Sequence, residues 1–215
     1  MSGVQIPPGP CIFWDTEKGN GFLDKFNSAY LIIIREVEMN YRIVYLLKGE
    51  SKKYAEKLIK DVAKKFHVNY CYSGRQSAHI TLKYRFETNN LKKVEKLIEG
   101  VCKNNKSSYF EIGGIGNFTK HALILKVKPS KEMVKFEKEL VKTLKDYKGD
   151  LSKYDKLLHK NFHVGIAHHD IKEKFSEINS YLKKFNRKFK VKFDKVYLIK
   201  KPKNRWIIRK RYIIK

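Results

Sequence analysis

Two segments, HITL at residues 79–82 and HVGI at residues 163–166, each place a histidine at the start of an alternating apolar run. Apolar side chains stand one and three positions after each histidine, which is the period of two typical of a β-strand with one buried face. The histidine and the residue two positions later then share the opposite face. The matched register predicts a duplicated unit in which each half contributes one imidazole.

Around these two segments, strand patterns alternate with amphipathic helical patterns. The expected strands are 41–47, 78–86, 109–118, 122–127, 162–167, 189–199 and 206–214, and the expected helices are 49–66, 91–102, 131–147 and 171–185, the last three capped by Asn90, Ser130 and Asp170. The order strand, helix, histidine strand, helix, strand occurs twice. We therefore predict an α+β fold of two pseudo-symmetric lobes, 41–118 and 122–214, each an antiparallel sheet with helices on its outer face, around a central groove.

Residues 1–38 differ in composition from the rest of the chain. The stretch from Ser2 to Pro10 is rich in Pro and Gly and carries no charge. We expect 1–38 to be a disordered leader, or else not to be translated, because the true start codon is that of Met39. The domain is expected to span 39–215. Deleting the leader should then leave stability and activity nearly unchanged.

The charge balance favours a polyanionic partner. The chain has 48 Lys and Arg against 22 Asp and Glu, a net charge of +26. Such an excess creates a strong positive field and favours a nucleic-acid ligand, although a solvated Lys-rich surface is the alternative. No long uncharged apolar run is present, so no membrane span is expected. Three widely spaced Cys predict free thiols in a reducing compartment, and we expect a cytoplasmic monomer.

On these motifs the chain resembles the 2H phosphoesterase superfamily, which includes 2′-5′ RNA ligase-like proteins and RNA 2′,3′-cyclic phosphodiesterases. The superfamily carries a His-x-Thr/Ser motif on a strand of each lobe, lining a central cleft. His79-Ile80-Thr81 fits this motif fully, whereas His163-Val164-Gly165 has Gly where Thr or Ser is expected. The resemblance covers 39–215. It implies hydrolysis of RNA 2′,3′-cyclic phosphate ends to 2′-phosphate without a cofactor or metal, with reverse 2′-5′ ligation as a further activity.

This chemistry suggests roles for individual residues. Two imidazoles with near-neutral pKa values can take a proton from water and give one to the leaving oxygen. His79 and His163 are therefore the expected catalytic pair, with the acid and base roles left open. Thr81 shares the face of His79 and can donate to phosphate. The other candidate phosphate ligands are Gly165, Lys83 and Arg75, and the candidates for stacking on a base are Tyr84 and Phe162.

Several alternatives stay open. The histidine pair could be structural, or Gly165 could mark an RNA-binding protein with a weakened site. The substrate could instead be a 2′-5′ oligoadenylate, a cyclic nucleotide or an ADP-ribose cyclic phosphate. His159 and His163, with His168 and His169, could suggest a metal site. The spacing of the first two suits a helix face, but 162–167 reads as a strand and no acidic or Cys partner is close, so no metal is expected. The glycines at 113, 114 and 116 predict a bulged strand.

Overall fold

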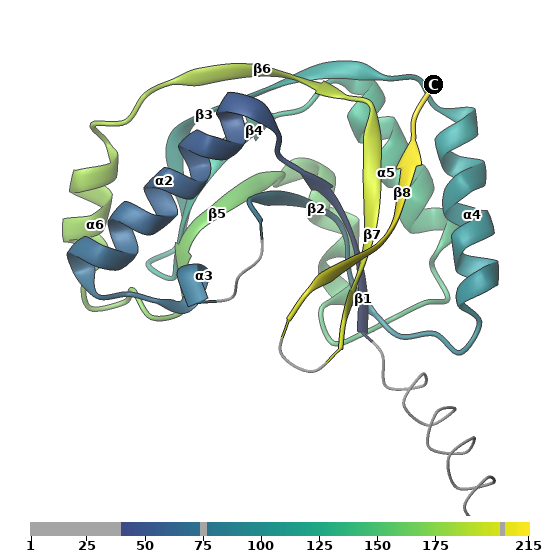
Figure 1. Ribbon diagram of the computed structural model, residues 1–215, viewed down its shortest axis with the longest axis horizontal. Coiled ribbons are helices and arrows are strands. Elements are labelled where there is room, and N and C mark those ends of the chain that lie inside the picture. Colours follow the sequence, from purple (N-terminus) through teal and green to yellow (C-terminus); the bar gives the residue numbers. More distant parts are fainter. Residues whose placement is uncertain (1–39, 74–76, 203–204) are drawn as a thin grey trace, which may run out of the picture. The chain divides into compact units, whose positions relative to one another are not determined.

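The computed structural model describes residues 40–73, 77–202 and 205–215, which belong to one compact unit (Figure 1). Its strands are β1 (Asn40–Leu46), β2 (His79–Phe86), β3 (Ser108–Phe118), β4 (Ala122–Lys128), β5 (His163–His168), β6 (Lys188–Phe193), β7 (Lys195–Lys201) and β8 (Ile207–Ile213). Its helices are α2 (Gly49–Phe66), α3 (Tyr70–Ser73), α4 (Leu91–Asn104), α5 (Lys131–Thr143), α6 (Phe175–Leu182) and the 3₁₀ helix η1 (Ser152–Lys160). The expectation for residues 1–38 lies outside the described residues.

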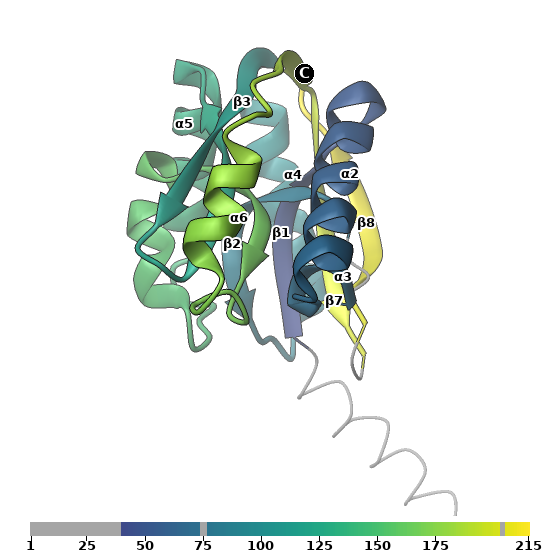
Figure 2. The same ribbon diagram turned by 90° about the vertical axis from the view of Figure 1, so that its left-hand side faces the viewer.

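The strands form two antiparallel sheets of four, in the orders β2-β1-β7-β8 and β5-β4-β3-β6. Helices α4 and α5 contact β8 and β2 of the first sheet, and α2 and α3 contact β5 of the second (Figures 1 and 2). Each sheet has its histidine strand at one edge, and these two edge strands contact each other. The expected α+β class, with two antiparallel sheets and helices packed against them, is confirmed.

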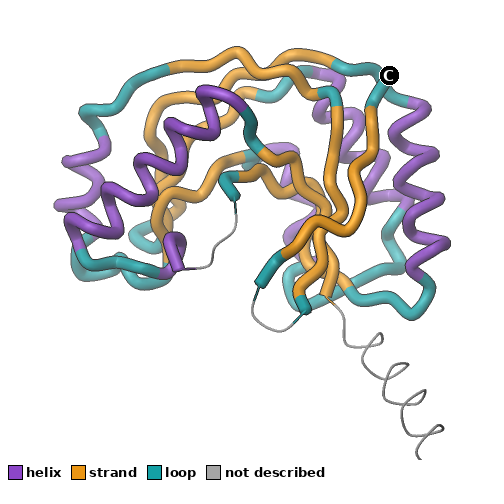
Figure 3. The backbone as a smooth tube through the Cα atoms, in the orientation of Figure 1, coloured by secondary structure: helices purple, strands orange, loops and turns teal. Residues whose placement is uncertain are grey.

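Each sheet draws its strands from both halves of the chain. Strand β7 pairs with β1 in the first sheet, and β3 pairs with β4 and β6 in the second. The lobe boundaries expected at 41–118 and 122–214 therefore differ from the boundaries of the sheets. The single strand expected over 189–199 is two strands, β6 and β7, which belong to different sheets and are separated at Asp194 (Figure 3). Apolar alternation shows only that a strand has one buried face, and it does not show which sheet the strand belongs to. The alternation therefore continues from β6 into β7 although the two strands belong to different sheets.

Two of the three predicted helix caps are confirmed. The side chains of Asn90 and Ser130 accept the N-cap hydrogen bonds of α4 and α5. Asp170 does not cap a helix, because its Oδ2 accepts from the backbone N–H groups of Asn69 at 2.7 Å and Tyr70 at 2.9 Å. Helix α6 therefore begins later than expected. A partner 101 residues away leaves no local signal in the sequence.

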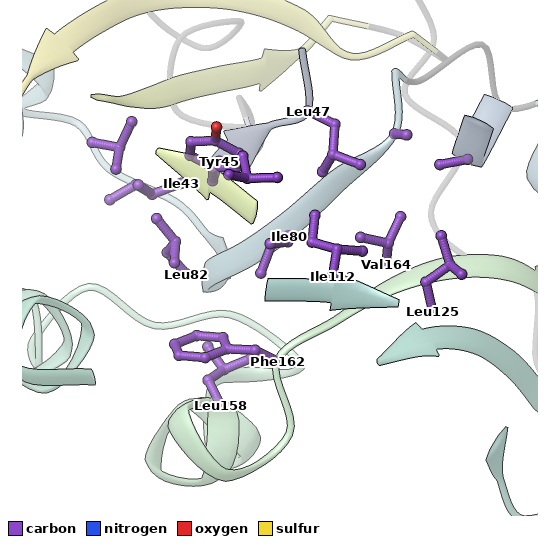
Figure 4. Packing of buried hydrophobic residues seen from close by; sticks show 14 of the residues in the cluster. Ile43, Tyr45, Leu47, Ile80, Leu82, Ile112, Leu125, Leu158, Phe162 and Val164 are labelled. Atoms are coloured by element: carbon purple, nitrogen blue, oxygen red, sulfur yellow. The ribbon is translucent and has the colours of Figure 1, made fainter. Parts of the chain in front are cut away.

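A hydrophobic core joins the two sheets and fixes which way the histidine strands face. Tyr45 of β1 is fully buried, with its ring centroid 5.3 Å from that of Phe110 and 5.8 Å from that of Phe193, both in the second sheet. Ile80 and Val164, each following a histidine, are fully buried in the same core (Figure 4). Burying one such side chain contributes about 1.5–3 kcal/mol. A slip of one residue would expose them, so the register holds each histidine on the opposite face.

No helix in the described parts of the chain is both long and apolar enough to cross a bilayer.

The glycine-rich stretch of β3 is bulged as expected, with a register shift between Ile112 and Ile115.

Candidate active site

The two histidine strands share an irregularity at the same place. The pairing of β2 with β1 skips Leu82, and the pairing of β5 with β4 skips Ile166, so each strand has one extra residue three positions after its histidine. Such a bulge reverses the faces of the side chains that follow it. Both strands accordingly show the same burial sequence, in which the first, third and sixth positions are partly exposed. These positions hold His79, Thr81 and Tyr84 in β2, and His163, Gly165 and His168 in β5.

All six of these residues line one groove of about 1010 Å³. The structure thus brings together the expected catalytic pair, His79 and His163, with Thr81, Gly165 and Tyr84 beside them. Three cationic side chains, those of Arg42, Arg85 and Lys201, also line the groove. Arg85 pairs with Asp150, which also lines the groove, so the positive charge that suits an anionic ligand comes mainly from Arg42 and Lys201.

Both histidines make the same hydrogen bond to the backbone. Nδ1 of His79 lies 3.0 Å from the carbonyl oxygen of Ser77, and Nδ1 of His163 lies 2.7 Å from that of Asn161. A carbonyl oxygen only accepts, so Nδ1 carries the proton in each ring and Nε2 is left with a free lone pair. The two imidazoles therefore have matched orientation and matched tautomers.

Burial lowers the pKa of both rings. The pKa of His79 falls to about 3, because of burial first and the Arg42 guanidinium second, although the hydrogen bond to Ser77 opposes the change. Burial also lowers the pKa of His163, and its hydrogen bond to Asn161 acts in the opposite direction. Both rings are neutral at pH 7. An anion bound between them favours their charged forms and raises both pKa values.

Arg42 was not predicted from the sequence. This β1 residue lines the groove, and its guanidinium carbon lies 4.6 Å from the centre of the Trp206 ring. Among the described residues, its buried Nε has no hydrogen-bond partner. Burial lowers its pKa, yet a guanidinium stays charged at any physiological pH. An arginine between the apolar Tyr41 and Ile43 was the available signal, because it marks a polar face on a central strand.

Lys83 was expected to bind phosphate, and the structure contradicts this. The bulge at Leu82 turns Lys83 into the interior, where it is 2% exposed. Its Nζ donates to Oδ2 of Asp155 at 2.6 Å, while Oδ1 of that carboxylate accepts from the backbone N–H of Tyr84 at 2.9 Å. The prediction assumed unbroken alternation along the strand, and the extra residue exchanged the places of Lys83 and Tyr84.

The remaining candidates divide between groove and core. Phe162 is 5% exposed and lies with Leu158 in the core, so it cannot stack on a base in the groove, and that prediction is wrong (Figure 4). Tyr84 lines both the groove and a smaller pocket of about 360 Å³ next to His163. Arg75 lies outside the described residues.

Within the described ranges, no cluster of three or more His, Cys, Asp or Glu residues could hold a metal ion. The reactive side chains that line the groove include imidazoles, cations and a threonine hydroxyl.

Two edge strands with matched histidines thus face one groove on an α+β fold. The family model of the 2′-5′ RNA ligase superfamily matches residues 53–205, and the chain belongs to this superfamily.

Solved structures share the fold at low sequence identity. Escherichia coli LigT complexed with 3′-AMP is 12% identical, with a TM-score of 0.53 over 82% of this chain and 98% of LigT. TT0787 of Thermus thermophilus is 12% identical, with a TM-score of 0.52 over 81% of this chain and 97% of its own. A search of curated proteins by sequence found no match.

Proposed function

We propose that the protein is a metal-independent RNA 2′,3′-cyclic phosphodiesterase that opens the cyclic phosphate to a 2′-phosphate. The observation that carries this proposal is the matched histidine pair. His79 and His163 occupy equivalent positions on two contacting strands, bind the backbone through Nδ1 and line one groove, and Nε2 of each neutral ring is unprotonated. Two such groups can move both protons of the reaction without a metal.

The reaction needs one base and one acid. His79, beside the Arg42 cation, has the more strongly lowered pKa and takes the base role. Its Nε2 removes a proton from water as the water oxygen bonds to phosphorus. His163, its pKa raised by the bound anion, gives its Nε2 proton to the ribose 3′ oxygen as the P–O3′ bond breaks. After the product leaves, His79 releases its proton to water and His163 takes one up, which restores the starting protonation state of each ring.

Negative charge on the phosphate oxygens increases in the transition state. The Thr81 hydroxyl lies on the face of His79, and the Arg42 guanidinium lines the same groove. Donors held in place toward developing charge each contribute a few kcal/mol. We assign both residues to the non-bridging oxygens of the phosphate.

The substrate class is supported by charge and by the adjoining pocket. A net charge of +26 and a groove lined by three cations and one carboxylate, Asp150, favour a polyanion. Tyr84, Phe118 and Tyr154 line the smaller pocket, and aromatic rings stack on bases of any sequence. Structures of E. coli LigT contain 3′-AMP, ATP and NADP+, which supports a nucleotide ligand for the same fold.

The test is hydrolysis of 2′,3′-cyclic nucleotides and cyclic-phosphate RNA in EDTA, with the products identified by phosphorus NMR. We expect 2′-phosphate only, and a loss of about 10²–10⁴-fold in His79→Ala and in His163→Ala. His67→Ala, an exposed residue at the end of α2, is the matched control and should keep full activity. Full activity in both catalytic variants would refute the mechanism.

A second substrate separates the acid from the base. A para-nitrophenyl phosphodiester has a leaving group that needs no proton. It should restore turnover to His163→Ala and leave His79→Ala inactive. The opposite pattern would exchange the two roles.

The second candidate is an RNA-binding protein with little turnover, favoured by the absence of a hydroxyl at Gly165. It predicts RNA binding that His79→Ala does not change, with no hydrolysis of any cyclic phosphate. The same panel should include 2′-5′ oligoadenylate, a cyclic nucleotide and ADP-ribose cyclic phosphate, and the reverse 2′-5′ ligation.

A further inference from the structure

The two histidine strands differ at one position on the groove face. Three matched positions of each strand line the groove, in addition to Arg85 of β2, and in β2 the middle one of the three is Thr81, with a hydroxyl. In β5 the middle one is Gly165, with no side chain. The phosphate would therefore have a hydroxyl donor from one strand and none from the other. The third position of β5, His168, lies next to this gap.

His168 directs one edge of its ring toward Gly165. A Cβ placed on Gly165 would lie 3.6 Å from Cδ2 of His168 and 3.9 Å from its Nε2. The bulge at Ile166 makes this possible, since it puts His168 rather than Ala167 on the groove face. Nε2 of His168 thus lies close to the space that a threonine side chain at position 165 would occupy.

Aromatic neighbours hold the ring of His168. Its centroid lies 4.8 Å from that of Tyr70 and 4.7 Å from that of His169. Burial lowers its pKa to about 4, as does repulsion between its charged form and those of His169, His163 and Arg42, while Asp170 acts in the opposite direction. The ring is therefore neutral in the free protein and can donate one N–H. His168 lines the same groove as His163 of its own strand and Arg42 of β1.

We propose that His168 is a phosphate-binding residue that replaces the hydroxyl missing at Gly165, donating its Nε2–H to a non-bridging phosphate oxygen. This proposal rests on the proposed function of the groove. A Cβ at 165 makes an ordinary contact with the ring, and a branched hydroxyl side chain would extend one bond further. We therefore expect a hydroxyl at 165 and the imidazole of 168 to compete for the space beside the phosphate.

The central experiment is a double-mutant cycle on kcat/KM for a 2′,3′-cyclic nucleotide. His168→Ala should lose about 10–100-fold, the effect of one hydrogen bond to a charged group. His168→Gln, which keeps a donor and most of the packing, should recover part of the loss. Gly165→Thr should lower kcat/KM in the wild-type background and raise it in the His168→Ala background. Gly165→Ala, with a Cβ and no donor, separates the effect of space from that of a hydroxyl, and it should not raise kcat/KM in the His168→Ala background.

A binding measurement keeps this test independent of turnover. Inorganic phosphate is titrated into the wild-type protein with nitrogen-labelled histidine, and the ring signals are followed by NMR. We expect the Nε2 signal of His168 to shift on binding, and the affinity for phosphate to fall at least about fivefold in His168→Ala.

The outcomes distinguish this proposal from the proposed function. A His168→Ala variant within twofold of wild type, or a Gly165→Thr substitution that acts in the same direction in both backgrounds, would overturn the role of His168 while the catalytic pair stands. An absence of hydrolysis together with a phosphate-dependent shift at His168 would reject the proposed reaction and keep the phosphate site. An unshifted ring would reject the site.

Discussion

Asp155 stabilises the buried side of the histidine strand β2, and its substitution should lower the free energy of unfolding. Its carboxylate is 4% exposed, pairs with Lys83 Nζ at 2.6 Å and accepts from the N–H of Tyr84 at 2.9 Å. Asp155→Asn keeps the size of the side chain and an acceptor for Tyr84, but leaves the buried ammonium without its counter-charge. Breaking a buried pair from one side costs about 3–5 kcal/mol. Asp155→Ala also leaves the Tyr84 N–H unpaired, which adds about 1–3 kcal/mol.

Urea unfolding at pH 7, followed by circular dichroism, measures these losses. The double variant Lys83→Met/Asp155→Asn removes the unpaired charge and should recover most of the stability lost in Asp155→Asn. The control is Glu99→Gln, which breaks an exposed ion pair with Lys103 and should cost no more than about 0.5 kcal/mol. A loss below about 1 kcal/mol in Asp155→Asn, or a double variant no more stable than the single one, would refute the reasoning.

Four further predictions follow from the same structure. Glu137 is 1% exposed, and burial, with the nearby Asp155 carboxylate, raises its pKa from 4.5 to about 8. Between these two pH values the Glu137 carboxyl is protonated in the folded state and ionised in the unfolded state. The free energy of unfolding of the wild type should therefore fall as pH rises from 4.5 to 8. Glu137→Gln should match the wild type at low pH and be more stable than it by about 3–5 kcal/mol near pH 9, as measured by urea unfolding. Parallel pH curves for the two proteins would contradict this prediction. Because burial lowers the pKa of His163, kcat/KM should already be falling as pH rises toward neutrality, since the acid loses its proton earlier than an exposed histidine would; a rise in kcat/KM on approach to neutral pH would contradict the assignment. Thr81→Ala should reduce kcat/KM by the equivalent of about 1.5–3 kcal/mol with little change in unfolding free energy, and an equal loss of both would indicate a structural role. RNA affinity measured by fluorescence anisotropy should fall steeply with salt, and salt-independent binding would exclude phosphate contacts as its main source.

The sequence by itself determined the class of fold and the two histidines. Burial imposes a period of two on a strand and of 3.6 on a helix, and these periods are visible in any short window. Helix α2, from Gly49 to Phe66, has the predicted bounds, and the strand patterns at β2 and β5 placed both histidines on the groove face.

Tertiary structure decided the parts that depend on distant neighbours. Lys83 turned inward and Tyr84 outward because of one extra residue in β2, and the same bulge in β5 brought His168 beside Gly165. Arg42 joined the site because β1 pairs with β2, and β6 and β7 entered different sheets although their pattern is continuous. The physical reason is that a bulge, a strand partner and a buried ion pair are stabilised by contacts between segments far apart in the chain. Their energies depend on those contacts, so no local period in the sequence reports them.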